Sequence, residues 1–160
     1  MRNVLGIDPG LRRVGYAVLQ AGAGRISVAC AGVIETSGEL PSGARLEDIS
    51  SGVTQLLEEY LPDSLVMERI LFSRNVTSAL RVAEAVGVIK LAARRFGLEA
   101  VEIGANQVKL ALSGDGNAPK DQMQKIVGML LDLPSIPKPA DVADAIAIAY
   151  SFISRGWVPR

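Results

Sequence analysis

The feature that most restricts the fold is a change in hydrophobic periodicity along the chain. Three short apolar runs separated by brief turns come first, at 3–8, 14–20 and 25–36. Such spacing favours strands of an antiparallel meander. Later segments show helical periodicity and alternate with two further short apolar runs. This order predicts an α/β domain with a mixed sheet.

The later elements follow from apolar spacing and from helix-ending residues. One helix, 77–96, is apolar on most of its sides, which indicates either a central place in the core or a subunit interface. The chain of 160 residues shows no internal repeat or linker, so we expect one domain spanning 1–160. The remaining predicted helices are 45–61, 106–112, 119–131 and 140–154, and the remaining strands are 65–67 and 99–103.

The composition excludes several kinds of chemistry. The chain has no histidine and a single cysteine, Cys30. Ser-His-Asp and Cys-His systems need an imidazole, and zinc hydrolases nearly always use histidine ligands. Cys30 lies in an apolar run and is expected in the core. Hydrolytic chemistry must therefore use carboxylates, lysines, hydroxyls or a metal ion held by oxygen atoms.

The charge is balanced overall but unevenly distributed. There are 17 basic and 17 acidic residues, whereas nucleic-acid-binding proteins are usually basic. Residues 35–63 contain seven acids and one base, which leaves 16 bases and 10 acids elsewhere. We therefore expect one acidic outer face and one basic face.

Nothing in the sequence indicates a membrane segment. The most apolar stretch, 139–153, is interrupted by Asp141 and Asp144 and is too short to span a bilayer. The first ten residues lack the long apolar stretch of a signal peptide. A cytoplasmic location is expected.

Four acids stand in apolar surroundings. Asp8 and Glu68 each end a predicted buried strand, and Asp141 and Asp144 lie on one face of the last helix. If the two strands are neighbours and the helix crosses their ends, the four carboxylates converge. Converging carboxylates repel one another, and oxygen ligands suit Mg²⁺ or Mn²⁺. Two such ions can support hydrolysis of a phosphodiester.

Each acid also has a simpler interpretation. Asp8 precedes Pro-Gly and fits a turn. Asp141 or Asp144 fits a helix cap or a first-turn charge that complements the helix dipole. Glu68 fits a surface ion pair with Arg69. The metal hypothesis therefore rests on the joint pattern.

Four ordered sequence blocks carry a resemblance to a known family. They are Gly6-Ile7-Asp8-Pro9-Gly10 with Arg13 and Val14-Gly15-Tyr16; Met67-Glu68 with Arg74-Asn75 and Ser78-Ala79-Leu80; Gln107-Val108-Lys109 with Gly114, Gly116, Ala118, Lys120 and Gln122; and Ala140 to Ala149. Together they resemble the RuvC family, the bacterial Holliday junction resolvases. The resemblance covers residues 3 to about 150.

The resemblance implies an RNase H-like fold with a mixed five-stranded sheet flanked by helices. It implies a homodimer that makes paired symmetric incisions in four-way DNA junctions during recombination and repair, leaving 5′-phosphate and 3′-hydroxyl ends. It also implies a branch-migration complex of the RuvA and RuvB type as partner. Two Mg²⁺ ions are expected, with Mn²⁺ as a substitute. The implied catalytic residues are the metal ligands Asp8, Glu68, Asp141 and Asp144 together with the basic Lys109 and Lys120.

DNA contacts are expected from both lysines, from Arg13 and from the loop after the glutamate. The family often has a base-stacking aromatic residue in this loop. Here the aligned position is Leu71, and Phe72 follows it. Phe72 either acts as the wedge between bases or anchors the loop in the core. Arg74 and Asn75 are expected to contact DNA as well.

Three rival functions come from other classes. An actin-like ATPase also opens with Gly-Ile-Asp-x-Gly, but it needs a second lobe for which this chain is too short. A nuclease of the same fold acting on structured RNA is disfavoured by the lysine pair and the Asp-x-x-Asp of the last helix. A non-catalytic junction-binding module is disfavoured because all four carboxylates are present.

Overall fold

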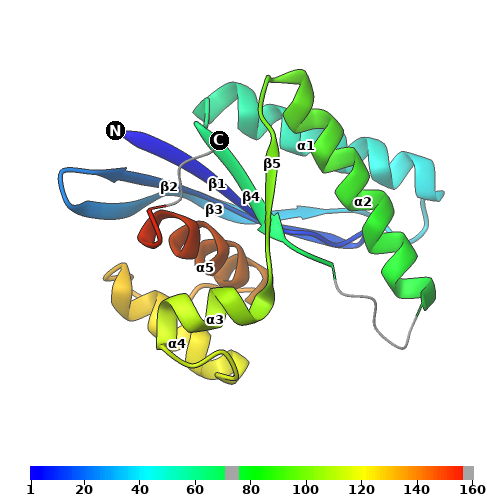
Figure 1. Ribbon diagram of the computed structural model, residues 1–160. Coiled ribbons are helices and arrows are strands. Elements are labelled where there is room, and N and C mark those ends of the chain that lie inside the picture. The colour runs from blue at the N-terminus through cyan, green and yellow to red at the C-terminus, as the bar shows by residue number, and fades with distance from the viewer. Residues whose placement is uncertain (71–75, 157–160) are drawn as a thin grey trace.

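The computed structural model describes residues 1–70 and 76–156. One five-stranded sheet in the order β3-β2-β1-β4-β5 separates two layers of helices (Figure 1). Leu71, Phe72, Arg74, Asn75 and Trp157 lie outside the described residues. The elements are β1 (Arg2–Asp8), β2 (Arg13–Gly22), β3 (Arg25–Glu35), α1 (Ser42–Tyr60), β4 (Ser64–Glu68), α2 (Val76–Arg95), β5 (Ala100–Ile103), α3 (Ala105–Ser113), α4 (Lys120–Leu130) and α5 (Ala140–Ser154).

The sheet is mixed, as predicted. β1, β2 and β3 form the expected antiparallel meander, and β4 and β5 run parallel to β1. β1 and β4 are direct neighbours with Ile7 opposite Met67. Because parallel strands end at the same edge of a sheet, Asp8 and Glu68 follow that pair side by side.

Each face of the sheet has its own core. On one face, α1 and α2 pack with side chains such as Ile49, Val53 and Ile89 against Leu5 and Ile7 of β1. On the other face, α3, α4 and α5 form a second core. It includes Val127, Ile146 and Phe152, together with Val4 and Val66. β1 is therefore covered on both faces, which explains its apolar run.

Helix α5 lies directly on the backbone of β1 and β2. A Cβ atom on Gly6 would overlap the carbonyl oxygen of Ala145, and one on Gly15 would overlap the carbonyl oxygen of Asp141. These two glycines therefore allow a helix of mostly small side chains to approach the sheet at backbone distance. The first turns of α5 are brought to the strand ends in this way.

Small differences from the expected elements have physical reasons. α1 begins at Ser42 rather than at 45, directly after Pro41, which is in extended conformation. The prediction began too late because the first turn of the helix carries no periodic apolar residue. Cys30 packs against the first core but is only half-buried, so the expectation of a core residue is met in part. The reason is that β3 is an edge strand.

Among the described residues, no helix combines the length and the apolar character needed to cross a membrane.

Candidate active site

The two strand-end acids occupy one edge of the sheet. Asp8 ends β1 and Glu68 ends the neighbouring parallel strand β4. Both side chains are partly buried. The sequence predicted this pair, because each acid follows a short apolar run whose strand is covered on both faces.

Helix α5 brings two further acids to the same edge. Asp141 lies in its first turn and Asp144 one turn further on, both partly exposed. Pro139 occupies the N-cap position and makes no side-chain cap hydrogen bond. The alternative that either aspartate caps the helix is therefore wrong, although Asp141 remains well placed to complement the helix dipole.

Basic side chains meet both aspartates of α5. The Nζ atom of Lys120 lies 2.6 Å from Oδ2 of Asp144, and Nε of Arg13 lies 3.4 Å from Oδ2 of Asp141. Both cations remain about half-exposed, at 61% and 48% of their side-chain surface. They are therefore within reach of a ligand that approaches from solvent.

The acids influence one another electrostatically. Burial, together with the charges of Asp144, Glu68 and Asp141 and against a lowering by Lys120, raises the pKa of Asp8 to about 7. Burial also raises the pKa of Glu68, with Asp144 adding to the effect and Lys120 and Lys109 opposing it. The hydrogen bond to Asp144 raises the pKa of Lys120. The site therefore holds more negative charge than its own lysines neutralise.

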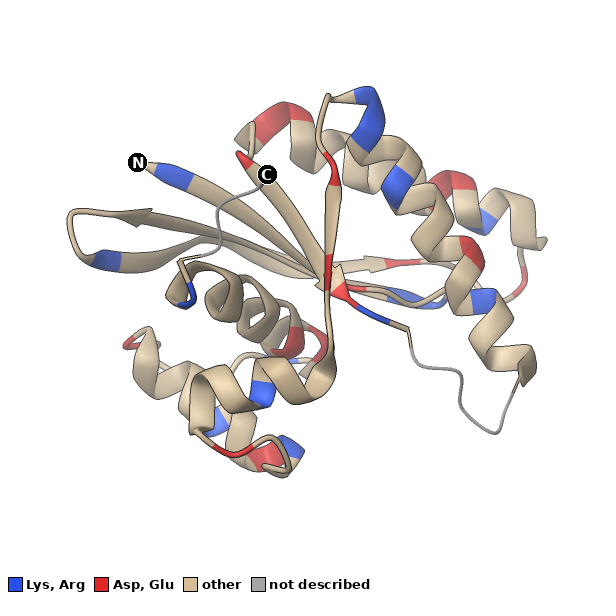
Figure 2. Cartoon of the chain, viewed as in Figure 1, with Lys and Arg blue, Asp and Glu red and all other residues tan. Residues whose placement is uncertain are grey.

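Two hollows open on this cluster and share Glu68. One, of about 210 Å³, is lined by Glu68, Lys109, Lys120 and Asp144 among others. The second, of about 250 Å³, is lined by Asp8, Glu68 and Arg69 among others. Figure 2 shows acidic colour at the end of β4 and at the start of α5, and basic colour on α3. The four predicted acids and two predicted lysines thus come together at one edge.

The cluster fits a divalent cation in its donor set. All four acids supply oxygen, as Mg²⁺ and Mn²⁺ prefer, and burial together with the charges of the other three acids raises the pKa of Asp8. Within 1–70 and 76–156, no three His, Cys, Asp or Glu side chains already converge as an ion site. In the structure Asp141 pairs with Arg13 and Asp144 pairs with Lys120. A cation would compete with both basic groups.

The interpretation of Glu68 as a surface ion-pair partner of Arg69 is not supported. The backbone N–H of Arg69 donates to the carbonyl of Ile103 at 2.8 Å, which continues the contact between β4 and β5. Among the described residues no salt bridge joins Arg69 to Glu68.

Two residues that shape the site were not identified as functional from the sequence. Gly6 and Gly15 appeared only within a motif, yet they determine how closely α5 approaches the sheet. Their spacing from the acids indicates a functional role only once it is known that α5 packs against them.

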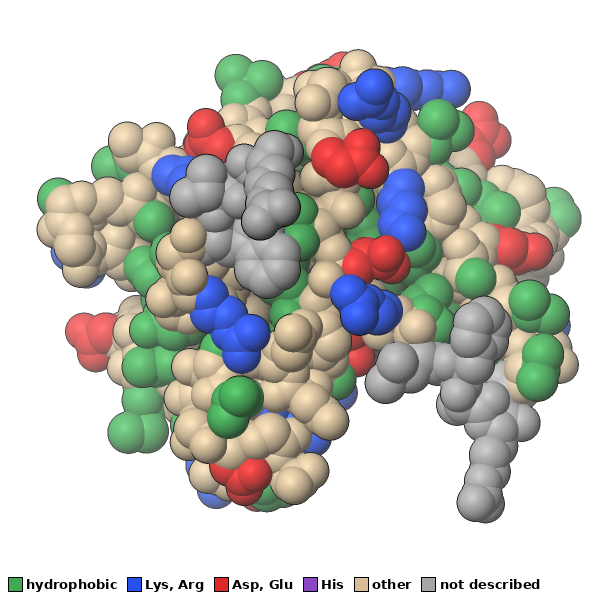
Figure 3. Space-filling view, in the orientation of Figure 1, with side chains coloured by type: hydrophobic (Ala, Val, Ile, Leu, Met, Phe, Trp, Pro, Cys, Tyr) green, Lys and Arg blue, Asp and Glu red, His purple; other side chains and the backbone are tan. Residues whose placement is uncertain are grey.

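The charge pattern is more mixed than expected. The acids of α1, including Glu47 and Glu58, are exposed on the layer that lies across the sheet from α5. On the face shown in Figure 3, however, basic and acidic side chains alternate, and neither sign forms one field there. On this face the basic side chains do not form a wide basic surface.

Comparison with known proteins agrees with this geometry. The family model described as crossover junction endodeoxyribonuclease RuvC matches residues 4–152. The chain belongs to the RuvC family. A RuvC relative from Thermosipho melanesiensis is 44% identical over 148 residues, covering 92% of this chain and 94% of the relative. One from Heliobacterium modesticaldum is 42% identical over 146 residues, covering 91% and 90%.

Solved structures share the fold over nearly the whole chain. The T. thermophilus RuvC in complex with a Holliday junction substrate matches with a TM-score of 0.92 and 32% identity, covering 98% of this chain and 95% of that one. The yeast mitochondrial Holliday junction resolvase Ydc2 matches with a TM-score of 0.67 at 17% identity, covering 96% and 79%, which shows the fold alone. The predicted RNase H-like fold and the resemblance to RuvC are thereby confirmed.

Proposed function

We propose that this chain resolves four-way (Holliday) DNA junctions by paired hydrolytic incisions that depend on divalent metal ions. The observation that carries the proposal is the meeting of four carboxylates and two lysines from five separate elements at one sheet edge. Membership of the RuvC family supports the substrate, and a relative of the same fold binds a Holliday junction.

In this proposal Asp8, Glu68, Asp141 and Asp144 hold two Mg²⁺ ions, for which Mn²⁺ substitutes. When bound, such ions supply positive charge beside the attacking and leaving oxygens of a phosphodiester. The oxygen of a water molecule joins phosphorus while the bond to the 3′ oxygen breaks. The 3′ oxygen takes up a proton, so the ends are a 5′-phosphate and a 3′-hydroxyl.

The lysines bind and orient the DNA backbone in this proposal. The compact ammonium group of Lys120 pairs with Asp144 and can pair with a phosphate group instead. Lys109 is half-buried in the wall of the hollow that Lys120 and Asp144 also line, and it contributes positive charge beside Glu68. Both act where negative charge develops on the phosphate during the reaction.

Symmetric incision needs two active sites, and α2 offers a surface for a two-fold dimer. Its buried side packs on the sheet, whereas Leu80, Ala83, Gly87 and Leu91 are exposed at spacings of three and four. The two leucines expose 55% and 52% of their surface. A helix pair related by two-fold symmetry would bury this stripe.

The dimer has a direct test. Sedimentation at micromolar concentration should give a dimer for the natural chain, and Leu80→Glu combined with Leu91→Glu should give a monomer. Met129→Glu on α4 places one such charge on an apolar side chain that is 80% exposed, and it should remain dimeric. A natural chain that sediments as a monomer would refute this interface.

The proposal also covers base preference and the binding of a protein partner. Leu71, Phe72, Arg74 and Asn75 follow β4 in sequence and belong to the loop expected to read bases near the cut. A branch-migration complex of the RuvA and RuvB type is the proposed partner, because the family implies it. A cytoplasmic location is consistent with such a partnership.

The decisive experiment compares a synthetic mobile junction with linear duplex in the presence of Mg²⁺. We expect paired symmetric nicks in the junction alone. Asp8→Asn should abolish the nicks and retain junction binding, whereas the exposed Asp48→Asn on α1 should cut normally. Binding without cutting in Mg²⁺ or Mn²⁺ would favour a junction-binding module. Neither binding nor cutting would favour a structured RNA substrate.

A further inference from the structure

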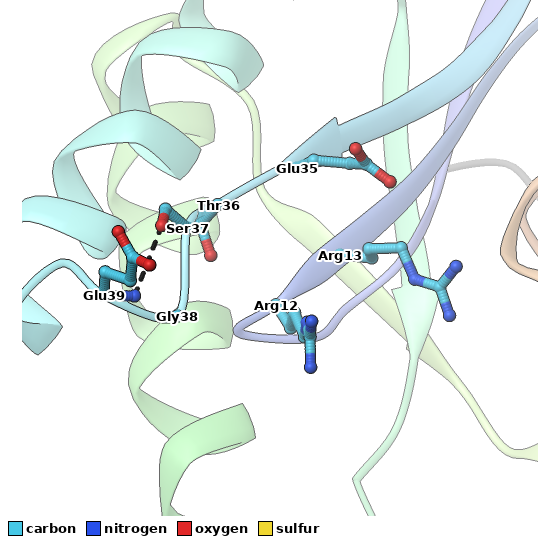
Figure 4. A pocket seen from close by; sticks show the side chains of 7 residues that line it. All are labelled: Arg12, Arg13, Glu35, Thr36, Ser37, Gly38 and Glu39. Carbon is cyan, nitrogen blue, oxygen red and sulfur yellow. Dashed lines mark hydrogen bonds between the residues drawn. The ribbon is translucent and has the colours of Figure 1, made fainter.

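A hollow of about 600 Å³ lies beside the candidate active site, between the β1–β2 turn and the segment that joins β3 to α1. Figure 4 shows its lining side chains. Arg12 comes from the turn and Arg13 from the start of β2, while Glu35 comes from the end of β3. Ser37 and Glu39 come from the joining segment. Nothing in the proposed reaction above uses this hollow.

The turn that carries Arg12 and leads into Arg13 is held by hydrogen bonds to neighbouring segments. The backbone N–H of Thr36 donates to the carbonyl of Arg12 at 3.0 Å, and its hydroxyl donates to the carbonyl of Leu11 at 2.6 Å. Nε of Arg45 donates to the same hydroxyl at 3.0 Å. Thr36 is buried, with 6% of its surface exposed. A ligand that binds here therefore orders little additional backbone.

Arg13 links the hollow to the active site. It lines the hollow, and its Nε atom also lies 3.4 Å from the carboxylate of Asp141. Arg13 therefore joins the hollow to the acids, which would let a strand bound at the acids continue into the hollow.

Of the two arginines, Arg13 pairs with Asp141, which leaves Arg12 to bind a ligand. Its side chain is exposed and points to a different side of the turn from Arg13 (Figure 4). In the part of the chain that the structure describes, no acidic group forms a salt bridge with it. A guanidinium group in this state can donate two parallel hydrogen bonds to a phosphate.

We propose that this hollow is a subsite for the DNA backbone next to the cleaved phosphate, with Arg12 binding one phosphodiester. The inference rests on the proposed function, since it takes junction DNA as the ligand. Glu35 and Glu39 extend from the walls of the same hollow and oppose a phosphate there. Neutralising one of them must therefore change affinity in the direction opposite to the loss of Arg12.

The test measures junction affinity across a salt series in chelator, so that no cutting occurs. Arg12→Ala should lower the slope of log affinity against log salt by about one, which makes the affinity loss between about 50 and about 200 mM salt roughly 3.5-fold smaller. Arg12→Lys should restore most of the slope because it retains the charge. Glu39→Gln should tighten binding. Arg25→Ala removes an exposed arginine at the other end of β2 and β3 and should leave the slope in chelator unchanged. In a separate assay with Mg²⁺ it should also leave the cutting unchanged.

The outcomes separate the subsite from the function. If the natural chain cuts junctions but Arg12→Ala and Glu39→Gln bind with its slope and affinity, the hollow lies off the DNA path and the subsite is wrong. An equal loss of slope with Arg25→Ala would also overturn it, since binding would then report only total charge. A natural chain that neither binds nor cuts junctions would instead refute the proposed function. Thermal unfolding of each variant checks that the fold is retained.

Discussion

Replacing Asp8 by Asn should stabilise the metal-free protein while abolishing cleavage. Burial and the three neighbouring carboxylates raise the pKa of Asp8 from 3.8 to about 7. The folded state therefore binds the Asp8 proton more tightly than the unfolded state does. Stability from this group is full below about pH 4 and is lost as the pH rises to about 7. Asn carries no charge at any pH and avoids that loss.

The size of the effect follows from the shift. About three pKa units correspond to about 4 kcal/mol, an upper limit because solvent screens the partly exposed side chain. We expect Asp8→Asn to gain about 2 to 4 kcal/mol at about pH 8, or roughly 5 to 15 °C in Tm for a domain of this size. Near pH 4 the two proteins should be equally stable.

Denaturant unfolding in chelator at the two pH values measures the gain directly. Asp48→Asn removes an exposed acid of the same kind on α1 and should show no comparable gain. Adding Mg²⁺ should stabilise the natural chain more than the Asp8→Asn variant, because the variant lacks a ligand. The electrostatic argument fails if Asp8→Asn is no more stable than the natural chain at about pH 8 in chelator.

The remaining predictions concern the positioning of the site. Gly15→Ala places a Cβ against the carbonyl of Asp141 and should abolish cleavage and destabilise the fold by about 1–3 kcal/mol, measured by nicking and denaturant unfolding, whereas Gly43→Ala, in open space, should do neither. Thr36→Val removes a buried hydroxyl with two hydrogen bonds and should cost about 1–3 kcal/mol in the same unfolding assay. Lys120→Gln should reduce the cleavage rate at saturating junction, and a rate equal to that of the natural chain would remove the lysine from the reaction.

The acids and strands of the site were predictable because their patterns are local. Asp8 and Glu68 each end a short apolar run, and such a run bounded by turn residues indicates a strand buried on both faces. The three-residue spacing of Asp141 and Asp144 places them on one side of a helix whatever it packs against. Four ordered blocks then sufficed to indicate the family.

The close packing of α5 on β1 and β2 was not predictable in the same way, because these elements are far apart in the sequence and meet only in the fold. Gly6 and Gly15 match no helix or strand signal, and their role appears only when α5 lies across β1 and β2. The same holds for Thr36, whose hydroxyl joins the β1–β2 turn to α1 through Leu11 and Arg45. In both cases a residue with little or no side chain determines how closely two segments with charged groups approach: the glycines for α5 and the sheet, and Thr36 for the β1–β2 turn and α1. The chemistry of the site therefore depends on residues that carry none of it, and substitutions at Gly15 should affect cleavage as strongly as substitutions of the acids themselves.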